Sequence, residues 1–163
     1  MKIRGMGLAM VVLWMAVAGA RAEQGWGVGM ILGEPTGVTV KKWLGPERAL
    51  DAAAAWSFSE NDSFQFHADY LIHKYIAWKT EEAAGRLPVY FGVGARVKMQ
   101  ERHGGRGRND HDTLLGVRVP FGLAYLFPKA PVELFAELVP ILDVFPDTDL
   151  DVNAAIGARY TFR

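Results

Sequence analysis

A set of charged and titratable residues recurs on the polar phase of an alternating sequence, and these side chains could act together. In an extended strand successive side chains point to opposite faces, so residues of one phase meet on one side of a sheet. Inside a narrow barrel, unpaired charges cost several kcal/mol per ion. We therefore predict a paired structural network that lines a lumen. Its members are Lys41, Asp51, His67, Asp69, His73, Arg96, Lys98, Arg118, Glu133, Glu137 and Arg159. The expected pairs are Glu133 and Glu137 with Arg159 or Arg118, and Asp51 with Lys41 or His73.

Glycines on the same phase indicate that this lumen is plugged. A barrel of eight strands is only wide enough inside for side chains to fill. Residues without a side chain leave room for the long charged groups, so we expect a filled interior and not an open pore. These glycines are Gly27, Gly29, Gly92, Gly94, Gly116, Gly122 and Gly157.

Histidines and acids on one strand raise the question of a metal site. His67, Asp69 and His73 share a phase, but a strand rises about 3.3 Å per residue, which separates the two histidines by roughly 20 Å. One ion cannot bind both, so a structural hydrogen-bonding role is favoured. We expect no metal site and no cofactor.

Catalysis by a lipid-modifying enzyme is the alternative that the residues leave open. Ser57 and His67 lie on one phase of neighbouring strands, with Asp69 close by, and a serine, a histidine and an acid can form a nucleophilic site. Glu133 and Glu137 are weaker candidates for an acid and base pair, because neighbouring arginines would hold both ionised.

The segment Gln100 to Thr113 is rich in glycine, arginine, aspartate and histidine, and it predicts a long exposed loop. His103 and His111 within it could bind an ion or an anionic lipid headgroup weakly. A solvated loop is the favoured interpretation.

The elements that position these residues are strands with a period of two. In the last of them, residues from Leu150 to Phe162 alternate apolar and polar, and aromatics stand near its end. Turn residues divide the chain into eight such stretches. The sequence predicts an all-β fold, an eight-stranded antiparallel up-and-down transmembrane β-barrel, with its apolar face toward lipid and its termini on one side. The stretches are Trp26–Gly33, Thr36–Leu44, Ala49–Phe58, Ser63–Trp78, Leu87–Met99, Leu115–Phe127, Val132–Val144 and Leu150–Arg163.

Aromatic residues gather at the strand ends, as they do where a barrel meets the two membrane interfaces. The predicted girdle on the side of the termini contains Trp26, Trp78, Tyr125, Phe127, Tyr160 and Phe162, and the opposite girdle contains Trp56, Phe58, Phe64 and Phe66.

Three residues fit this pattern badly. Pro120 and Pro140 fall inside strands, where each loses a ladder hydrogen bond, and Trp43 falls on the polar phase. We expect local irregularity at all three.

Composition and the amino-terminal segment indicate an exported protein. The 163 residues carry a formal net charge of +0, which gives no electrostatic case for nucleic acid, and contain no cysteine. Lys2 and Arg4 precede an apolar run that ends before Ala20-Arg21-Ala22, a small-x-small cleavage pattern. We predict a signal peptide at residues 1–22, Sec-type export, and a barrel over residues 23–163 in a bacterial outer membrane.

Short motifs in a fixed order resemble an uncharacterised family of small bacterial outer-membrane β-barrel proteins. The resemblance covers nearly the whole mature chain and implies the barrel fold but no reaction and no catalytic residues. The terminal Phe162 also looks like the signal that the outer-membrane assembly machinery reads, although Arg163 follows it. The motifs are Gly33-Glu34-Pro35-Thr36-Gly37 with Lys41 and Trp43, His67-Ala68-Asp69-Tyr70-Leu71, Gly116-Val117-Arg118-Val119-Pro120, Glu137-Leu138-Val139-Pro140 and Ala155-Ile156-Gly157-Ala158-Arg159-Tyr160.

The function that these observations favour is non-enzymatic: a small closed barrel that contributes to the envelope or presents a surface. Its expected partners are outer-membrane lipid and, during biogenesis, periplasmic chaperones and the assembly machinery, and it is expected to be a monomer. Two alternatives remain, an enzyme that modifies lipid A or phospholipid, and a soluble periplasmic carrier with the faces inverted, as in lipocalins.

Overall fold

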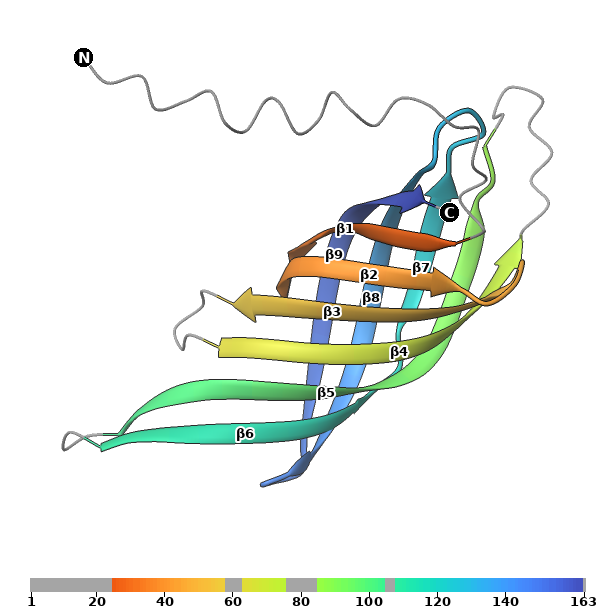
Figure 1. The fold of residues 1–163 in the computed structure, drawn as a ribbon. Helices are drawn as coiled ribbons and strands as arrows, with labels where there is room; N and C mark the ends of the chain where they lie inside the picture. Colours follow the sequence, from red (N-terminus) through yellow and green to blue (C-terminus); the bar gives the residue numbers. More distant parts are fainter. Residues whose placement is uncertain (1–24, 58–62, 76–84, 105–107, 163) are drawn as a thin grey trace, which may run out of the picture.

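The computed structural model describes residues 25–57, 63–75, 85–104 and 108–162, and the predicted signal peptide therefore lies outside the described residues. Antiparallel strands make up the described chain, and each is hydrogen-bonded to its neighbours around a closed ring (Figure 1). No helix of the length and apolarity needed to cross a bilayer occurs in these ranges. The strands are β1 (Trp26–Gly33), β2 (Thr36–Trp43), β3 (Arg48–Ser57), β4 (Ser63–Tyr75), β5 (Pro88–Gly104), β6 (Arg108–Arg118), β7 (Phe121–Leu126), β8 (Val132–Phe145) and β9 (Asp149–Phe162).

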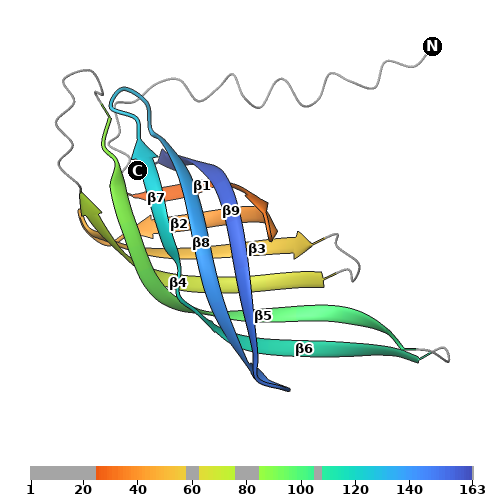
Figure 2. The same cartoon turned by 180° about the vertical axis from the view of Figure 1, so that it is seen from behind.

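The first and last strands close the ring. Trp26 of β1 lies opposite Phe162 of β9, and the two strands pair antiparallel along the whole of β1. The start of β1 and the end of β9 therefore lie on the same side of the barrel, as Figures 1 and 2 show. The all-β antiparallel barrel predicted from the sequence is confirmed.

Strands β6 and β7 are two pieces of one strand, so the wall has the predicted eight strands. Arg118 pairs with Ile141 and Phe121 pairs with Leu138, which keeps one register across the interruption. Pro120 stands in that interruption, so the irregularity expected there is confirmed. Pro140, in contrast, lies inside a continuous β8, where its carbonyl accepts a hydrogen bond of 3.0 Å from the Val119 amide.

The strands are staggered around the ring, which tilts them relative to the barrel axis. Following paired residues from Gly37 through β3, β4 and β5 leads to Leu114 of β6. Following them from Gly37 the other way, through β1, β9 and β8, leads to Ala124 of β7, ten residues further along the same strand. This offset lets side chains of distant strands meet inside.

The two faces of the wall have opposite chemistry. Val93, Leu138 and Ile156 are 55%, 52% and 61% exposed on the outside, whereas Arg96 and Arg118 are 2% and 0% exposed inside. Alternation along each strand produces this division, because every second side chain turns to the interior. The apolar face points outward and the charged face inward, in the orientation that the sequence predicts.

The irregularity expected at Pro140 is absent, because β8 and β9 keep one register through it. Two further expectations were wrong. The described parts of the segment predicted as a long loop, residues 100–104 and 108–113, are instead strand, since the β5–β6 ladder continues from Gly94 opposite Arg118 to Gly104 opposite Arg108. A polar composition predicts a loop when strands are recognised by an apolar face, but backbone pairing within a hairpin does not require one. Trp43 is regular, paired with Ala49 in β2–β3, and its ring lies in the lumen.

Candidate functional site: the charged lumen

The lumen contains three groups of ionic contacts that follow one another along the barrel. The first lies toward the chain termini and centres on Lys41, which is completely buried. Its Nζ donates hydrogen bonds of 2.9 and 3.1 Å to the two carboxylate oxygens of Glu133, and it lies 2.9 Å from Nε2 of His73. The ammonium also stands 4.3 Å from the ring centroid of Trp43, a cation–π distance. Lys41 is thus enclosed by a carboxylate, an imidazole and an indole.

Arg159 extends this first group across the lumen. One guanidinium nitrogen, Nη1, donates to Glu133 at 2.8 Å, and Nη2 donates to Asp51 at 2.5 Å. The hydroxyl of Thr39 accepts from the guanidinium at 3.1 and 3.2 Å and donates to Asp51 at 2.9 Å. The guanidinium stacks 3.8 Å from the ring centroid of Phe135. A continuous chain of contacts therefore runs from Lys41 to Asp51.

The second group lies on β4, β5, β6 and β8. Arg118 donates from Nε to both oxygens of Asp69, at 3.0 and 3.2 Å, and its Nη2 lies 3.9 Å from Glu137. Tyr90 donates its hydroxyl to Glu137 at 3.0 Å. Within the described ranges neither Nη atom of Arg118 has a hydrogen-bond partner, and in the first group the same holds for Nε1 of Trp43 and Nδ1 of His73.

The third group lies toward the opposite end of the barrel. Arg96 donates from Nε and Nη2 to the two oxygens of Asp143, at 3.0 and 2.5 Å, and from Nη1 to Asp151 at 2.9 Å. A half-open cavity of about 310 Å³ adjoins it. This end of the lumen is therefore polar and accessible, and the lining is Arg96, Lys98, Gln100, Asp112, Leu114, Asp143, Pro146, Asp147, Asp149, Leu150 and Asp151.

The geometry gives no support to a metal centre or a serine triad. Across the part of the chain that the structure describes, no three histidine or acidic side chains could hold one ion. His67 lies 3.3 Å from Gln65 through Nδ1. His67 stands opposite Ala53 of β3, and Ser57 is four residues further along that strand, a displacement of about 13 Å.

Glycines at two positions make room for carboxylates. A Cβ added to Gly94 would come within 1.9 Å of an oxygen of Asp69, and one added to Gly116 within 2.3 Å of an oxygen of Asp143. Gly27 differs, because an added Cβ would meet nothing closer than 3.5 Å. Only some of the glycines on the inner phase are therefore required by the ionic groups.

One expected pair does not form, and several members of the network were not anticipated. Asp51 bonds to Arg159 and Thr39, although it lies opposite Lys41 in the β2–β3 ladder. The side chain of Lys41 turns instead toward Glu133, across the lumen. The residues that the sequence analysis did not include are Thr39, Trp43, Tyr90, Phe135, Asp143 and Asp151, all of which stand on the inner phase, and that phase was the signal for them.

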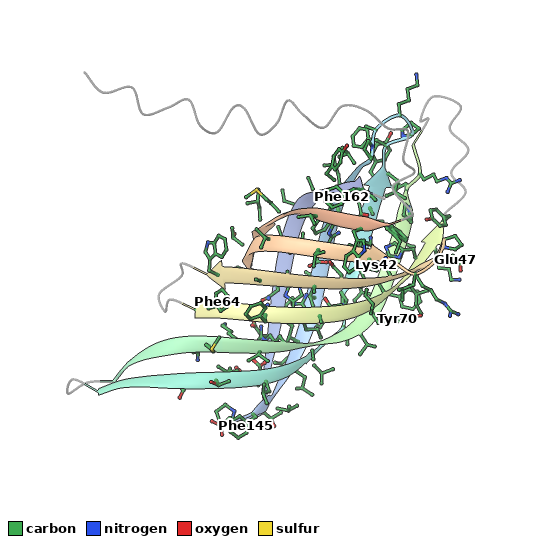
Figure 3. All side chains as sticks on the ribbon, in the orientation of Figure 1. Lys42, Glu47, Phe64, Tyr70, Phe145 and Phe162 are labelled. Atoms are coloured by element: carbon green, nitrogen blue, oxygen red, sulfur yellow. The ribbon has the colours of Figure 1, made fainter. Side chains whose placement is uncertain are left out.

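Aromatic residues form two groups on the wall. At the terminal end, Trp26 pairs with Phe162, whose ring centroid lies 5.7 Å from that of Tyr160, and Tyr125 meets Phe127 edge to face at 4.8 Å. At the opposite end, Trp56 is the ladder partner of Phe64, which contacts Phe66 at 5.0 Å. Figure 3 labels Phe162 and Phe64 at these two ends. Phe58 and Trp78 lie outside the described residues.

Comparison with known proteins shows the fold. No family model matches the chain, and no curated protein matches it. Among solved structures, the N-terminal β-barrel domain of Pseudomonas aeruginosa OprF superposes with a TM-score of 0.60 at 13% identity, over 84% of this chain and 95% of that domain. Neisserial surface protein A (NspA) superposes with a TM-score of 0.53 at 12% identity, over 84% of this chain and 93% of that protein.

These neighbours define a class of fold, that of small outer-membrane β-barrels. The resemblance found in the sequence is confirmed to that extent, while no match assigns the chain to a particular family.

Proposed function

We propose that this chain is a small closed barrel of a bacterial outer membrane, whose lumen is filled by charged side chains and whose role is structural or surface-interacting and non-enzymatic. The observation that carries the proposal is the opposition of the two faces. Large apolar side chains cover the outside, and buried arginines, a lysine and carboxylates occupy the inside.

The outer face supports residence in a bilayer. Monomeric soluble proteins rarely expose continuous apolar patches above a few hundred Å². Here exposed apolar residues occur on every strand of the wall, between two groups of aromatics that suit the membrane interfaces. A soluble carrier of an apolar ligand would need the inverse arrangement, with an apolar lumen.

The paired charges support a closed interior. Lys41, Glu133 and Arg159 are all buried, and their mutual hydrogen bonds hold them across the axis of the barrel. Apolar side chains pack in the same region, among them Trp43 and Phe135. We infer from this a barrel that does not conduct solutes. We further propose that it is a monomer surrounded by outer-membrane lipid. The predicted signal peptide at residues 1–22 supports Sec-type export, with delivery by periplasmic chaperones and the assembly machinery.

Fractionation and efflux test the proposal together. We expect the protein in the outer-membrane fraction, released by detergent and not by periplasmic extraction. After reconstitution into vesicles, we expect trapped glucose to leave no faster than from empty vesicles. Release from the periplasm without detergent contradicts the membrane location, and rapid glucose efflux contradicts the filled lumen.

Lipid modification is the second function to test, because His67 is buried in the lumen close to Asp69. The register argues against it, since Ser57 lies four positions from the ladder partner of His67. Lipid A and phospholipid profiles by mass spectrometry should be identical with wild-type protein and with His67→Ala. A lipid species lost in the variant contradicts the non-enzymatic assignment.

A further inference from the structure

Strand β9 extends past its neighbour β1 at the open end of the barrel. β1 ends at Gly33, opposite Ala155, so the segment Asp149–Ala154 has a ladder partner on its β8 side and none on the other among the described residues. At the junction the Glu34 amide donates to the Ala154 carbonyl at 3.0 Å. Figures 1 and 2 show this end of β9 beyond the end of β1. We call Asp149–Ala154 the β9 free edge.

Two amide groups of this edge donate to aspartates of the same segment. Because the Ala154 carbonyl faces β1, the backbone groups two and four residues earlier, in Val152 and Leu150, face the same way. The Leu150 amide donates to Asp149 Oδ1 at 2.9 Å, and the Val152 amide donates to Asp151 Oδ1 at 2.9 Å. Unpaired edges attract other strands, so these carboxylates restrict which strands can add.

The side chains of the edge alternate between acid and apolar. Leu150 and Val152 are 70% and 55% exposed on the outer side. Asp149 and Asp151 belong to the lining of the open cavity, whose other acids are Asp112, Asp143 and Asp147 and whose bases are Arg96 and Lys98. Among the described residues that line this cavity, five acids stand against two bases, which gives the lining a negative charge.

We propose that the β9 free edge binds an extended segment of a partner protein in which basic and apolar residues alternate, by addition of a strand. This rests on the surface-interacting role proposed above and names the chemistry of the partner. Basic side chains on the inner face of the incoming strand form ion pairs with the carboxylates of Asp149 and Asp151. The amides of Leu150 and Val152 are thereby released to pair with the backbone of that strand.

Alternation in the partner follows from the geometry of the pair. Residues directly opposite in an antiparallel pair point to the same face, so apolar residues of the partner cover Leu150 and Val152 while basic residues meet the aspartates. A neutral strand would displace the aspartates from these amides and offer them no other donor. Asp149 would then lose the donor that the Leu150 amide supplies, and Asp151 would keep only Arg96. The edge therefore selects basic strands over neutral or acidic ones.

Binding of synthetic peptides to the full chain in nanodiscs of zwitterionic lipid tests the proposal. The probe is a fluorescein-labelled peptide of alternating lysine and valine, followed by anisotropy. The controls are a peptide of the same composition with its lysines and valines in separate blocks, a glutamate–valine alternating peptide, and empty nanodiscs. We expect the alternating basic peptide to bind at least about tenfold more tightly than either control peptide.

Variants separate edge pairing from simple attraction to an acidic mouth. The double variant Asp149→Asn, Asp151→Asn should weaken peptide binding by about tenfold or more, because the ion pairs of both aspartates with the peptide's lysines are lost. The matched control, Asp147→Asn, removes the same kind of charge from the same cavity lining and should change binding less than about twofold. Val152→Pro removes an amide that faces the free edge and leaves the β8 ladder intact, so it should abolish binding.

Several outcomes overturn the proposal. They are equal binding of the block peptide, an equal loss in Asp147→Asn, equal binding to empty nanodiscs, and peptide-independent association of two copies that competes with the peptide. Migration of each variant on gels with and without boiling reports whether the barrel is folded. A protein that inserts into membranes and fails to bind the peptide refutes the edge while the outer-membrane assignment stands, whereas a protein that does not insert refutes that assignment itself.

Discussion

The two ends of the lumen use the same chemical groups and differ in how they are enclosed. At the end near the termini, Arg159, Lys41 and Glu133 are sealed among Trp43 and Phe135. At the other end, Arg96 and Asp143 also form a buried pair, but Asp151, the second carboxylate that Arg96 binds, is 37% exposed at the wall of a cavity.

Enclosure separates the charges that stabilise the barrel from the charges that a partner can reach. A buried pair that loses one member leaves an uncompensated charge, at a cost of about 3–5 kcal/mol, whereas exposed pairs contribute about 0–1 kcal/mol. We therefore expect stability to depend on the sealed end and interaction to depend on the open one.

Substitution of Arg159→Met should have the largest effect. It leaves Asp51 and Glu133 short of a cation in a sealed site, so the free energy of unfolding should fall by about 3–5 kcal/mol. Urea unfolding in lipid vesicles, followed by tryptophan fluorescence, measures this. The control Arg48→Met removes an exposed arginine at the start of β3 and should change stability by less than about 0.5 kcal/mol. If Arg159→Met lowered the free energy of unfolding by less than about 1 kcal/mol, it would cost less than buried ion pairs do. The sealed end would then not differ from the open end in its contribution to stability.

Gly94→Ala should have an intermediate effect. The added methyl would overlap the carboxylate of Asp69, which binds Arg118, and would lie 2.3 Å from the carbonyl oxygen of Ala68. The Ala68 carbonyl belongs to the backbone of a paired strand, so it cannot move away without disturbing the ladder. We expect a loss of about 1–3 kcal/mol, as for overpacked cores. Gly27→Ala is the matched substitution, since its Cβ has ordinary contacts. Equal losses in the two variants would mean that the cost does not come from the overlap with the ionic group.

Asp151→Asn should have the smallest effect on stability. Arg96 keeps both contacts to Asp143, and the lost partner is partly exposed, so we expect a change of at most about 1 kcal/mol. The same unfolding assay checks it. A loss as large as that in Arg159→Met would show that the open end is as much a part of the stabilising core as the sealed one.

Much of the fold could be predicted because strand periodicity determines which face each side chain takes. Val93 and Arg96 are three residues apart, and their opposite locations follow from that spacing alone. The pairs inside the lumen depend on another quantity, the stagger of the ring. Asp51 stands beside Lys41 in the ladder, yet it meets Arg159 from β9, because tilted strands bring distant side chains together across the axis.

The length of the β5–β6 hairpin could not be predicted for a different reason. Sequence patterns reveal a strand through an apolar face, and residues from Glu101 to Asp110 do not carry one. The pairing of residues 101–104 with residues 108–111 continues a ladder that Gly94 and Arg118 begin. The β9 free edge could not be predicted either, because it depends on where the neighbouring strand β1 ends, opposite Ala155.

Quenching by brominated lipid tests the central claim, the opposite chemistry of the two faces, most directly. The chain contains no cysteine, so a single cysteine can be placed at will and labelled with bimane before refolding into vesicles. Bimane at Val93, Leu138 or Ile156 should be strongly quenched when the acyl chains carry bromine, and bimane at Thr39 should keep its emission. Quenching at Thr39 with full emission at Val93 and Ile156 would contradict the account.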